Sequence, residues 1–369
     1  MTVYLDHAAS SPMRPEAVAA MLPFLGDRYG NPSGSHALAR AARVAVEDSR
    51  DVIADTLGCA PGEVVFTSGG TESDNLAIGG APAGRRVCSA VEHHAVLRAV
   101  EAVGGTVVGV DTDGRVDLAA LRGALDDDVA VVSIMLANNE TGVVQDLAAI
   151  REAIGERVVL HTDAVAAFCW RDVAAEARPA DMVSISAHKF GGPMGVGVLA
   201  VRDRVVLHAL ALGGGQERER RSGTHNVAGI VGMAAAAAAT VRARADDARR
   251  VGALRDRLRD GIAGGAAGVT ISAPNTTHTA GTLHLRVADV ESEALVFALD
   301  QLGVATSAGS ACASGALEPS HVLAAMGVSA DDARGALRLS LGWSTTAADI
   351  DAALVAIPKA IEALRAGAG

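Results

Sequence analysis

Lysine is nearly absent from this 369-residue chain, although arginine is common. Lysine and arginine together number 32, and the only lysines are Lys189 and Lys359. Arginine stays protonated in proteins, whereas lysine can lose its proton and act as an amine nucleophile that forms an imine. A lysine retained against this background therefore predicts chemistry that arginine cannot perform.

Other scarcities exclude whole classes of protein. Aromatic residues make up only 2% of the chain, so Ala, Val, Leu and Ile must fill the core. The net charge of −11 argues against nucleic-acid binding, because phosphate contacts need clustered cations. We expect no secretory signal, because residues 1–10 lack an apolar run. We also expect no transmembrane helix, because the apolar run 233–239 is short and charged residues follow it.

The four cysteines form neither a C-x-x-C pair nor a dense framework. This pattern predicts reduced thiols in a cytoplasmic protein, rather than disulfides or a metal site. Cys88 and Cys169 have large apolar neighbours and are expected to be buried, whereas Cys59 lies in a predicted turn and could be exposed. Small residues surround Cys312 over 308–315, which predicts an exposed loop thiol that can react.

Apolar runs alternate with amphipathic segments along the first two-thirds of the chain. Strands are predicted at 64–66, 87–89, 106–110, 129–135, 158–161, 182–186 and 195–201. This alternation predicts the α/β class, with a mostly parallel sheet and helices on both faces. One helix or two joined helices over 227–261 would lead to a smaller α+β unit. We therefore predict an N-terminal arm over 1–15 that packs with the small domain, a large domain over 16–261 and a small C-terminal domain over 262–369.

A turn of small residues, Thr-Ser-Gly-Gly-Thr-Glu at 67–72, follows the first predicted strand and precedes a helix expected from Ser73. Free backbone N–H groups and the helix dipole favour an anion such as phosphate there. An ordinary turn with a threonine cap is the alternative. The turn lacks the glycine patterns of nicotinamide and nucleoside-triphosphate sites, which disfavours those ligands.

The segment Ser-Ala-His-Lys at 186–189 follows another predicted strand. A lysine at the carboxyl end of a parallel strand lies where open α/β sheets bind ligands. Ser186 and His188 could donate hydrogen bonds to a phosphate while Lys189 forms an imine. The alternative is a solvated surface lysine, which the scarcity of lysine in this chain disfavours.

Three further residues are candidates on their own chemistry. Asp163 ends a predicted strand, where its carboxylate could keep a pyridine nitrogen protonated or could merely cap a helix. His93 could stack on a flat ring or be structural, and its neighbour His94 makes a poor joint metal ligand, so no metal site is predicted. Arg338 in a predicted strand needs an anion, either a substrate carboxylate or an internal acidic residue.

Taken together, these segments resemble the cysteine desulfurases of the NifS/IscS type, in the class V aminotransferase group of fold-type I enzymes that use pyridoxal phosphate (PLP). The resemblance runs from Tyr4-Leu5-Asp6-His7 to Leu339-Ser340-Leu341-Gly342, nearly the whole chain. It also covers the segments 30–33, 67–75, 92–97, 138–142, 186–189, 221–224 and 309–323. It implies the fold of a fold-type I PLP-dependent transferase, with PLP in the large domain and the catalytic cysteine loop in the small one.

The resemblance implies a role for each matching residue. Lys189 would hold PLP covalently, Cys312 would receive sulfur as a persulfide, and His93 would stack on the ring and move protons. The residues implied to contact the cofactor are Gly70, Thr71, His93, Asn139, Asp163, Ser186, His188 and Lys189, with Thr224 entering from a second subunit. The residues implied to bind the substrate are Arg338, Asn31 and Asn139.

The implied activity is removal of sulfur from L-cysteine, which gives L-alanine and a persulfide for a sulfur-acceptor protein. The resemblance further implies a cytoplasmic homodimer with no nucleic-acid or membrane partner. Iron–sulfur cluster assembly, tRNA thiolation and a dedicated biosynthetic pathway all fit the acceptor. The alternatives are a PLP-dependent aminotransferase, a lyase acting on selenocysteine or a cysteine derivative, and a non-catalytic PLP-binding partner.

Two positions depart from the pattern of these desulfurases. Ala166 stands where the family usually has a glutamine that contacts the 3-oxygen of PLP. Its loss removes one hydrogen bond, worth roughly 1 kcal/mol. Trp343 stands where relatives often have an arginine. Both departures bear on cofactor tuning and leave Lys189, Asp163 and Cys312 in place.

Overall fold

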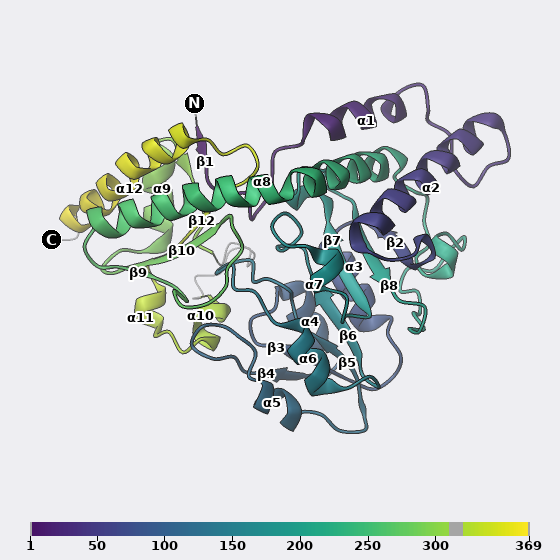
Figure 1. The fold of residues 1–369 in the computed structure, drawn as a ribbon, viewed down its shortest axis with the longest axis horizontal. Helices are drawn as coiled ribbons and strands as arrows, with labels where there is room; N and C mark the ends of the chain where they lie inside the picture. Colours follow the sequence, from purple (N-terminus) through teal and green to yellow (C-terminus); the bar gives the residue numbers. More distant parts are fainter. Residues whose placement is uncertain (1, 310–319, 368–369) are drawn as a thin grey trace.

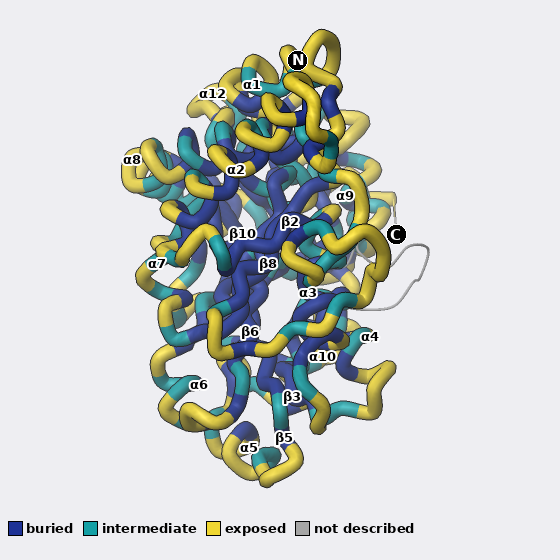
Figure 2. The backbone as a smooth tube through the Cα atoms, turned by 90° about the vertical axis from the view of Figure 1, so that its right-hand side faces the viewer, coloured by how far each residue is buried: buried dark blue, intermediate teal, exposed yellow. Residues whose placement is uncertain are grey.

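The computed structural model describes residues 2–309 and 320–367, which form a larger and a smaller unit (Figure 1). A seven-stranded sheet lies in the larger unit and a three-stranded sheet lies in the smaller one. Figure 2 shows the strands as the buried centre of the molecule, with exposed residues along the outer sides of the helices. This layering places the ends of the strands of the large sheet next to the smaller unit.

The large sheet has the strand order β2-β8-β7-β6-β5-β3-β4. Neighbours from β7 to β4 run parallel, whereas β8 is antiparallel to both β7 and β2. The predicted mostly parallel sheet is therefore confirmed. The strands are β2 (Val64–Thr67), β3 (Arg85–Ser89), β4 (Thr106–Val108), β5 (Val129–Ser133), β6 (Val159–Asp163), β7 (Met182–Ser186) and β8 (Gly197–Val201).

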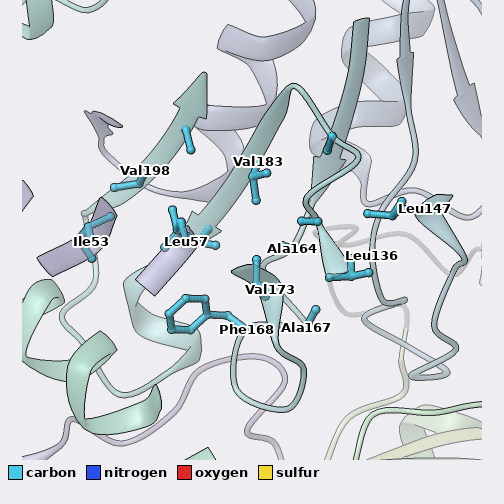
Figure 3. Packing of buried hydrophobic residues seen from close by; sticks show 14 of the residues in the cluster. Ile53, Leu57, Leu136, Leu147, Ala164, Ala167, Phe168, Val173, Val183 and Val198 are labelled. Atoms are coloured by element: carbon cyan, nitrogen blue, oxygen red, sulfur yellow. The ribbon is translucent and has the colours of Figure 1, made fainter. Parts of the chain in front are cut away.

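Helices cover the large sheet and bury its apolar side chains. Figure 3 shows part of the resulting core, in which Ile53 and Leu57 lie with Phe168, Val183 and Val198. Burial of both faces explains why the central strands are apolar runs rather than alternating patterns. The helical elements of this unit, apart from α8, are α1 (Pro15–Leu25), α2 (Ala37–Leu57), η1 (Pro61–Glu63), α3 (Gly70–Gly79), α4 (His94–Ala102), α5 (Leu118–Gly123), α6 (Leu147–Ile154), α7 (Val173–Glu176), η2 (Ala187–Lys189) and η3 (Glu217–Glu219).

The smaller unit is α+β, as predicted, and its antiparallel sheet has the order β12-β10-β9. The start of the chain joins this unit, because β1 (Val3–Tyr4) pairs in parallel with β11 (Val304–Ala305). Leu283, Leu295 and Ile357 belong to a second buried cluster beside this sheet. Its remaining elements are β9 (Val269–Ile271), β10 (Thr282–Val287), α9 (Ser292–Gln301), α10 (His321–Ala325), α11 (Ala330–Ala333), β12 (Ala336–Ser340) and α12 (Ala347–Gly367).

A single helix, α8 (Val227–Gly265), runs along both units (Figure 1). Its first half contributes Ile230 and Met233 to the core of the larger unit, and its second half contributes Leu258 and Ile262 to that of the smaller unit. Part of α8 is long and apolar enough to cross a membrane, but 56% of that stretch is buried within the protein. We interpret α8 as a core helix, because it packs against α1, α2 and α12.

A strained turn near α8 is held by a buried ion pair. Glu217, Arg218 and Glu219 have φ angles of 51°, 55° and 64°, a region that side chains other than glycine rarely adopt. The Glu217 carboxylate accepts two 2.8 Å hydrogen bonds from Arg50, one of 2.9 Å from the Phe66 N–H, and it lies 2.6 Å from His225 Nε2. Burial alone would raise the pKa of Glu217, but these hydrogen bonds lower it to about 2.

The Glu217→Gln variant should lose about 3 kcal/mol of unfolding free energy at neutral pH, because Arg50 would lose its buried counter-ion and keep only the half-exposed Glu47. A carboxyl group whose folded pKa is depressed stabilises the fold above its ordinary pKa of 4.5, and this contribution fades as the pH falls toward 2. The difference between wild type and variant should therefore shrink over that range. Denaturant unfolding measured at several pH values tests this, with the exposed Glu219→Gln as the control. An equal loss in both variants would contradict the role of the buried pair.

Candidate active site

A cavity of about 350 Å³ opens where the carboxyl ends of β6 and β7 meet the N-terminal arm, the start of α3 and β12. Open α/β sheets bind ligands at this edge. The cavity is also lined by Ala166 and Trp343, the two positions that depart from the family pattern. Candidate residues from six separate segments meet here, namely Gly70, Thr71, His93, Asn139, Asp163, Ser186, His188, Lys189 and Arg338.

Three candidate residues are not brought to this cavity by the described part of one chain. Thr224 is exposed and does not line the cavity, so its predicted entry into the site of a second subunit stays a prediction. Asn31 is also exposed, and its Oδ1 accepts a hydrogen bond from the N–H of Ser33 instead of facing the cavity. Cys312 lies outside the described residues.

The first turn of α3 forms the end of the cavity where an anion such as phosphate is predicted to bind. The helix begins at Gly70 and not at the predicted Ser73, and its N-cap residue, Gly69, has no side chain to cap it. The alternative of a threonine cap is therefore wrong. Gly69 has a φ of 151°, and a Cβ on Gly197 of β8 would lie 2.7 Å from the Gly69 Cα, so the close strand-to-helix approach requires glycine. Uncapped N–H groups at this helix end favour an anion.

Lys189 lies in η2, directly after β7. Its Nζ donates hydrogen bonds to the carbonyl oxygens of Ala8 (2.6 Å) and Ala9 (3.0 Å) in the N-terminal arm. The loop of Lys189 is itself held by this arm, because the Ser11 hydroxyl donates to the Lys189 carbonyl at 2.9 Å. The amine therefore reaches the cavity from a backbone that the N-terminal arm holds in place.

His93 caps α4 and faces the cavity as a neutral ring. Its Nδ1 accepts a hydrogen bond from the Ala95 N–H at 3.1 Å, so in the neutral ring the proton belongs on Nε2. Burial, followed by the charge of Lys189, lowers the pKa of His93 to about 4. The same causes lower the pKa of His188 to about 4. Both rings are therefore uncharged at neutral pH.

Asp163 ends β6 at the floor of the cavity and is 4% exposed. Its Oδ1 accepts a 2.8 Å hydrogen bond from the Val165 N–H. Burial raises the pKa of Asp163 to about 6, while this hydrogen bond and Lys189 oppose the shift. The site thus contains a buried carboxylate that a cationic group in the cavity would stabilise.

Arg338 of β12 is buried, and its guanidinium is shared between two partners. Nη1 donates to the Asn139 carbonyl at 3.0 Å, and Nη2 lies 2.9 Å from Asp6 Oδ1. The internal ion pair, one of the two alternatives from sequence, is therefore present. Nε is buried without a hydrogen-bond partner among the described residues, and the side chain lines the cavity.

Cys169 corrects the sequence analysis, which predicted a buried residue. It is partly exposed, lines the cavity and donates from Sγ to the Lys189 carbonyl at 3.3 Å. In the turn after β6, the side chain of Phe168 packs in the core, whereas that of Cys169 lies on the cavity side. Its surroundings still raise the pKa of the Cys169 thiol to about 12, chiefly by desolvation, so the thiol stays protonated at neutral pH. Cys88 is fully buried, as predicted.

Sequence reasoning assigned no role to a set of buried polar residues below the cavity. His161 of β6 lies between two hydroxyl groups, 2.8 Å from Ser133 Oγ and 2.9 Å from Ser184 Oγ. Asp74 of α3, a helix that packs against β6 and β7, also lines the cavity. Asp74 is one helical turn after Gly70, and this spacing was the available signal, because residues four apart share a helix face.

The comparisons with known proteins agree with this geometry. Residues 3–353 match the family described as aminotransferase class-V. An "IscS-like cysteine desulfurase" of Mycobacterium tuberculosis is 44% identical, over 99% of this chain and 98% of that protein. Among solved structures, a "NifS-like protein" has a TM-score of 0.90 at 33% identity and covers 98% of this chain and 100% of its own.

A further solved structure, "SspA in complex with cysteine", has a TM-score of 0.79 at 31% identity and covers 92% of this chain and 99% of its own. These relatives align with 92–99% of this chain, so they share nearly its whole architecture. The chain belongs to the class-V aminotransferase family, and its relatives within that family include proteins named cysteine desulfurases.

Proposed function

We propose that this protein is a PLP-dependent cysteine desulfurase that transfers sulfur from L-cysteine to Cys312. The observation that carries the proposal is the convergence of Lys189, Asp163 and the uncapped start of α3 on one cavity. These groups fit the three functional parts of PLP, which are an aldehyde, a pyridine nitrogen and a phosphate. Curated relatives named cysteine desulfurase and a structural relative complexed with cysteine support the same activity.

Each residue would hold one part of the cofactor. Gly70 and Thr71 would bind the phosphate together with Ser186 and His188, and Thr224 of a second subunit would complete that site. Asp163 would pair with the pyridine nitrogen, and His93 and Asn139 would lie against the ring. Lys189 would attach covalently. When bound, PLP supplies an electron sink next to the α-carbon of an amino acid.

The residues of the chain would carry out the remaining chemistry. Arg338 would bind the substrate carboxylate, with Asn139 and Asn31 as further contacts. Lys189, once the substrate has displaced it, would remove the proton from the α-carbon through Nζ. The neutral His93 would hold or move a proton at Nε2.

The sulfur step balances without an external oxidant. The Cys312 thiolate attacks the substrate sulfur, the carbon–sulfur bond breaks and a sulfur–sulfur bond forms. The former sulfur-bearing carbon takes up a proton, so L-cysteine and the Cys312 thiol give L-alanine and a Cys312 persulfide. A sulfur-acceptor protein would then remove the outer sulfur atom.

We also propose a cytoplasmic homodimer. Apolar side chains on one stretch of the chain are 61–75% exposed, namely Leu22 and Leu25 of α1 and Tyr29 after it, and Leu212 near Thr224 is 85% exposed. Such side chains are normally covered, and a second copy would cover them while bringing Thr224 to a neighbouring site. Sedimentation should therefore give twice the chain mass of 37.2 kDa, and a stable monomer would contradict this assembly.

Product analysis tests the proposed reaction. Purified protein supplied with PLP, L-cysteine and a reductant should release alanine and sulfide in equal amounts, because each turnover removes one sulfur atom. An aminotransferase would instead yield a keto acid from cysteine, and a non-catalytic PLP-binding partner would bind the cofactor and release neither product. Equimolar alanine and sulfide support the proposal, and either of the other outcomes rejects it.

A further inference from the structure

A buried chain of polar side chains crosses the sheet beneath the cavity. Ser133, His161 and Ser184 come from three adjacent parallel strands and are linked by hydrogen bonds of 2.8 Å and 2.9 Å. Strand register places Ser184 beside Asp163, which lies two residues after His161 and therefore on the same face of the sheet. Asp74 of α3 ends this chain, since it forms a hydrogen bond with Ser184 and lies 3.7 Å from His161 Nε2.

Within this row of buried polar side chains, Asp74 has no cationic partner. His161 is fully buried, and burial lowers its pKa to about 3, so the ring is neutral at neutral pH. A separation of 3.7 Å is too long for a hydrogen bond between the two side chains. Asp74 is 1% exposed, and its Oδ1 has no hydrogen-bond partner among the described residues. An ionised carboxylate in this position would be buried with one oxygen lacking a hydrogen bond from the described residues, which is costly.

Of the two aspartates, Asp163 is the one whose ionised form the surroundings stabilise better than that of Asp74. Both aspartates line the cavity, and two neighbouring buried carboxylates cannot both ionise without a large electrostatic cost. Asp163 has the N–H of Val165 and the charge of Lys189 to stabilise its anion. For Asp74, burial first, and then the charges of Asp163 and Glu92, raise the pKa well above its ordinary value, opposed by the Ser184 hydrogen bond. The proton shared by this pair therefore belongs on Asp74.

We propose that Asp74 is a positioning residue that stays protonated at neutral pH, so that Asp163 alone carries the negative charge facing the ring nitrogen of the cofactor. The part concerning the ring nitrogen rests on the proposed function, whereas the protonation of Asp74 does not. The groups that face Asp74 are Ser184, His161 and Asp163 from the sheet, and Glu92 from the loop before α4.

Isotope-edited infrared spectroscopy of the full-length protein, with and without PLP, tests the location of the proton. Labelling aspartate carboxyl carbons with ¹³C separates their bands from those of Glu92, whose own pKa burial raises to about 8. We expect an aspartate band of the protonated type at pH 7 that disappears in Asp74→Asn and persists in the exposed control Asp55→Asn. Absence of such a band, or its loss in Asp163→Asn but not in Asp74→Asn, would overturn the proposal.

Unfolding as a function of pH gives a second readout that needs no turnover. A carboxyl group whose folded pKa is raised destabilises the fold increasingly as the pH rises from its ordinary value of 3.8 to its folded value. The Asp74→Asn variant has no carboxyl group to cause this destabilisation. The ratio of its folding equilibrium constant to that of the wild type should therefore rise by up to about tenfold per pH unit over that range. Parallel profiles would show that Asp74 is ionised, and would reject the inference whether or not the protein is a desulfurase.

Discussion

The Lys189→Ala variant should lose alanine release from L-cysteine by about ten-thousand-fold or more. The amine at this position would both hold the cofactor and remove the α-proton, and positioned proton transfer alone contributes up to about 10⁴ in rate. The hydrogen bonds from Nζ to Ala8 and Ala9 would be lost as well, but these involve partly exposed carbonyl groups that water can reach. The fold should therefore persist, and PLP should bind only reversibly.

The chain contains its own control for this experiment. Lys359, the only other lysine, is an exposed residue of α12, so Lys359→Ala should keep wild-type activity and covalent PLP. Borohydride reduction followed by peptide mass analysis should find PLP on the peptide that contains Lys189 and on no other. Covalent PLP on Lys359, or full turnover by Lys189→Ala, would refute the assignment.

The Cys312→Ser variant should bind PLP normally, yet release alanine from cysteine about a thousandfold or more slowly. A hydroxyl group cannot replace a thiolate as the nucleophile that receives sulfur, whereas the residues around the proposed cofactor site are unchanged. Absorbance spectra before and after addition of L-cysteine should separate these two effects. Mass analysis of the Cys312 peptide in the wild type should show one added sulfur atom.

Cys169 provides the matched control, because it is the thiol that the structure places at the cavity wall. Desolvation raises its pKa to about 12, so almost none of it is thiolate at neutral pH. The Cys169→Ser variant should therefore retain most of the activity. If this variant loses alanine release while Cys312→Ser retains it, the sulfur is received at the cavity wall instead.

The parts of the fold that local sequence patterns determine were predictable. Buried parallel strands are short apolar runs, and the residues at their carboxyl ends, such as Asp163 and Lys189, must meet at one edge of the sheet. The start of α3 was misplaced because glycines at its N-terminus suggest a turn rather than a helix. Here the packing of Gly69 against Gly197 overrides the low helix propensity of glycine.

Contacts between distant segments were not predictable from one sequence. Arg338 and Asp6 are 332 residues apart, and nothing local to either identifies the other as its partner. The proximity of Asp74 to Asp163 depends on how α3 crosses the sheet, which follows from the whole core. Cys169 looked buried because its sequence neighbours are apolar, but a turn directs neighbouring side chains to opposite sides.

Because helix α8 contributes side chains to both cores, the coding sequence cannot be divided into two parts that each encode a complete unit. The predicted boundary between residues 261 and 262 falls inside this helix, one turn before its end at Gly265. A fragment ending at that boundary would carry Val251 and Leu258 into water with no small-unit core to cover them, and the complementary fragment would lack these residues. A split on either side of α8 would likewise separate half of this helix from the core that it completes, so the two units must be inherited together.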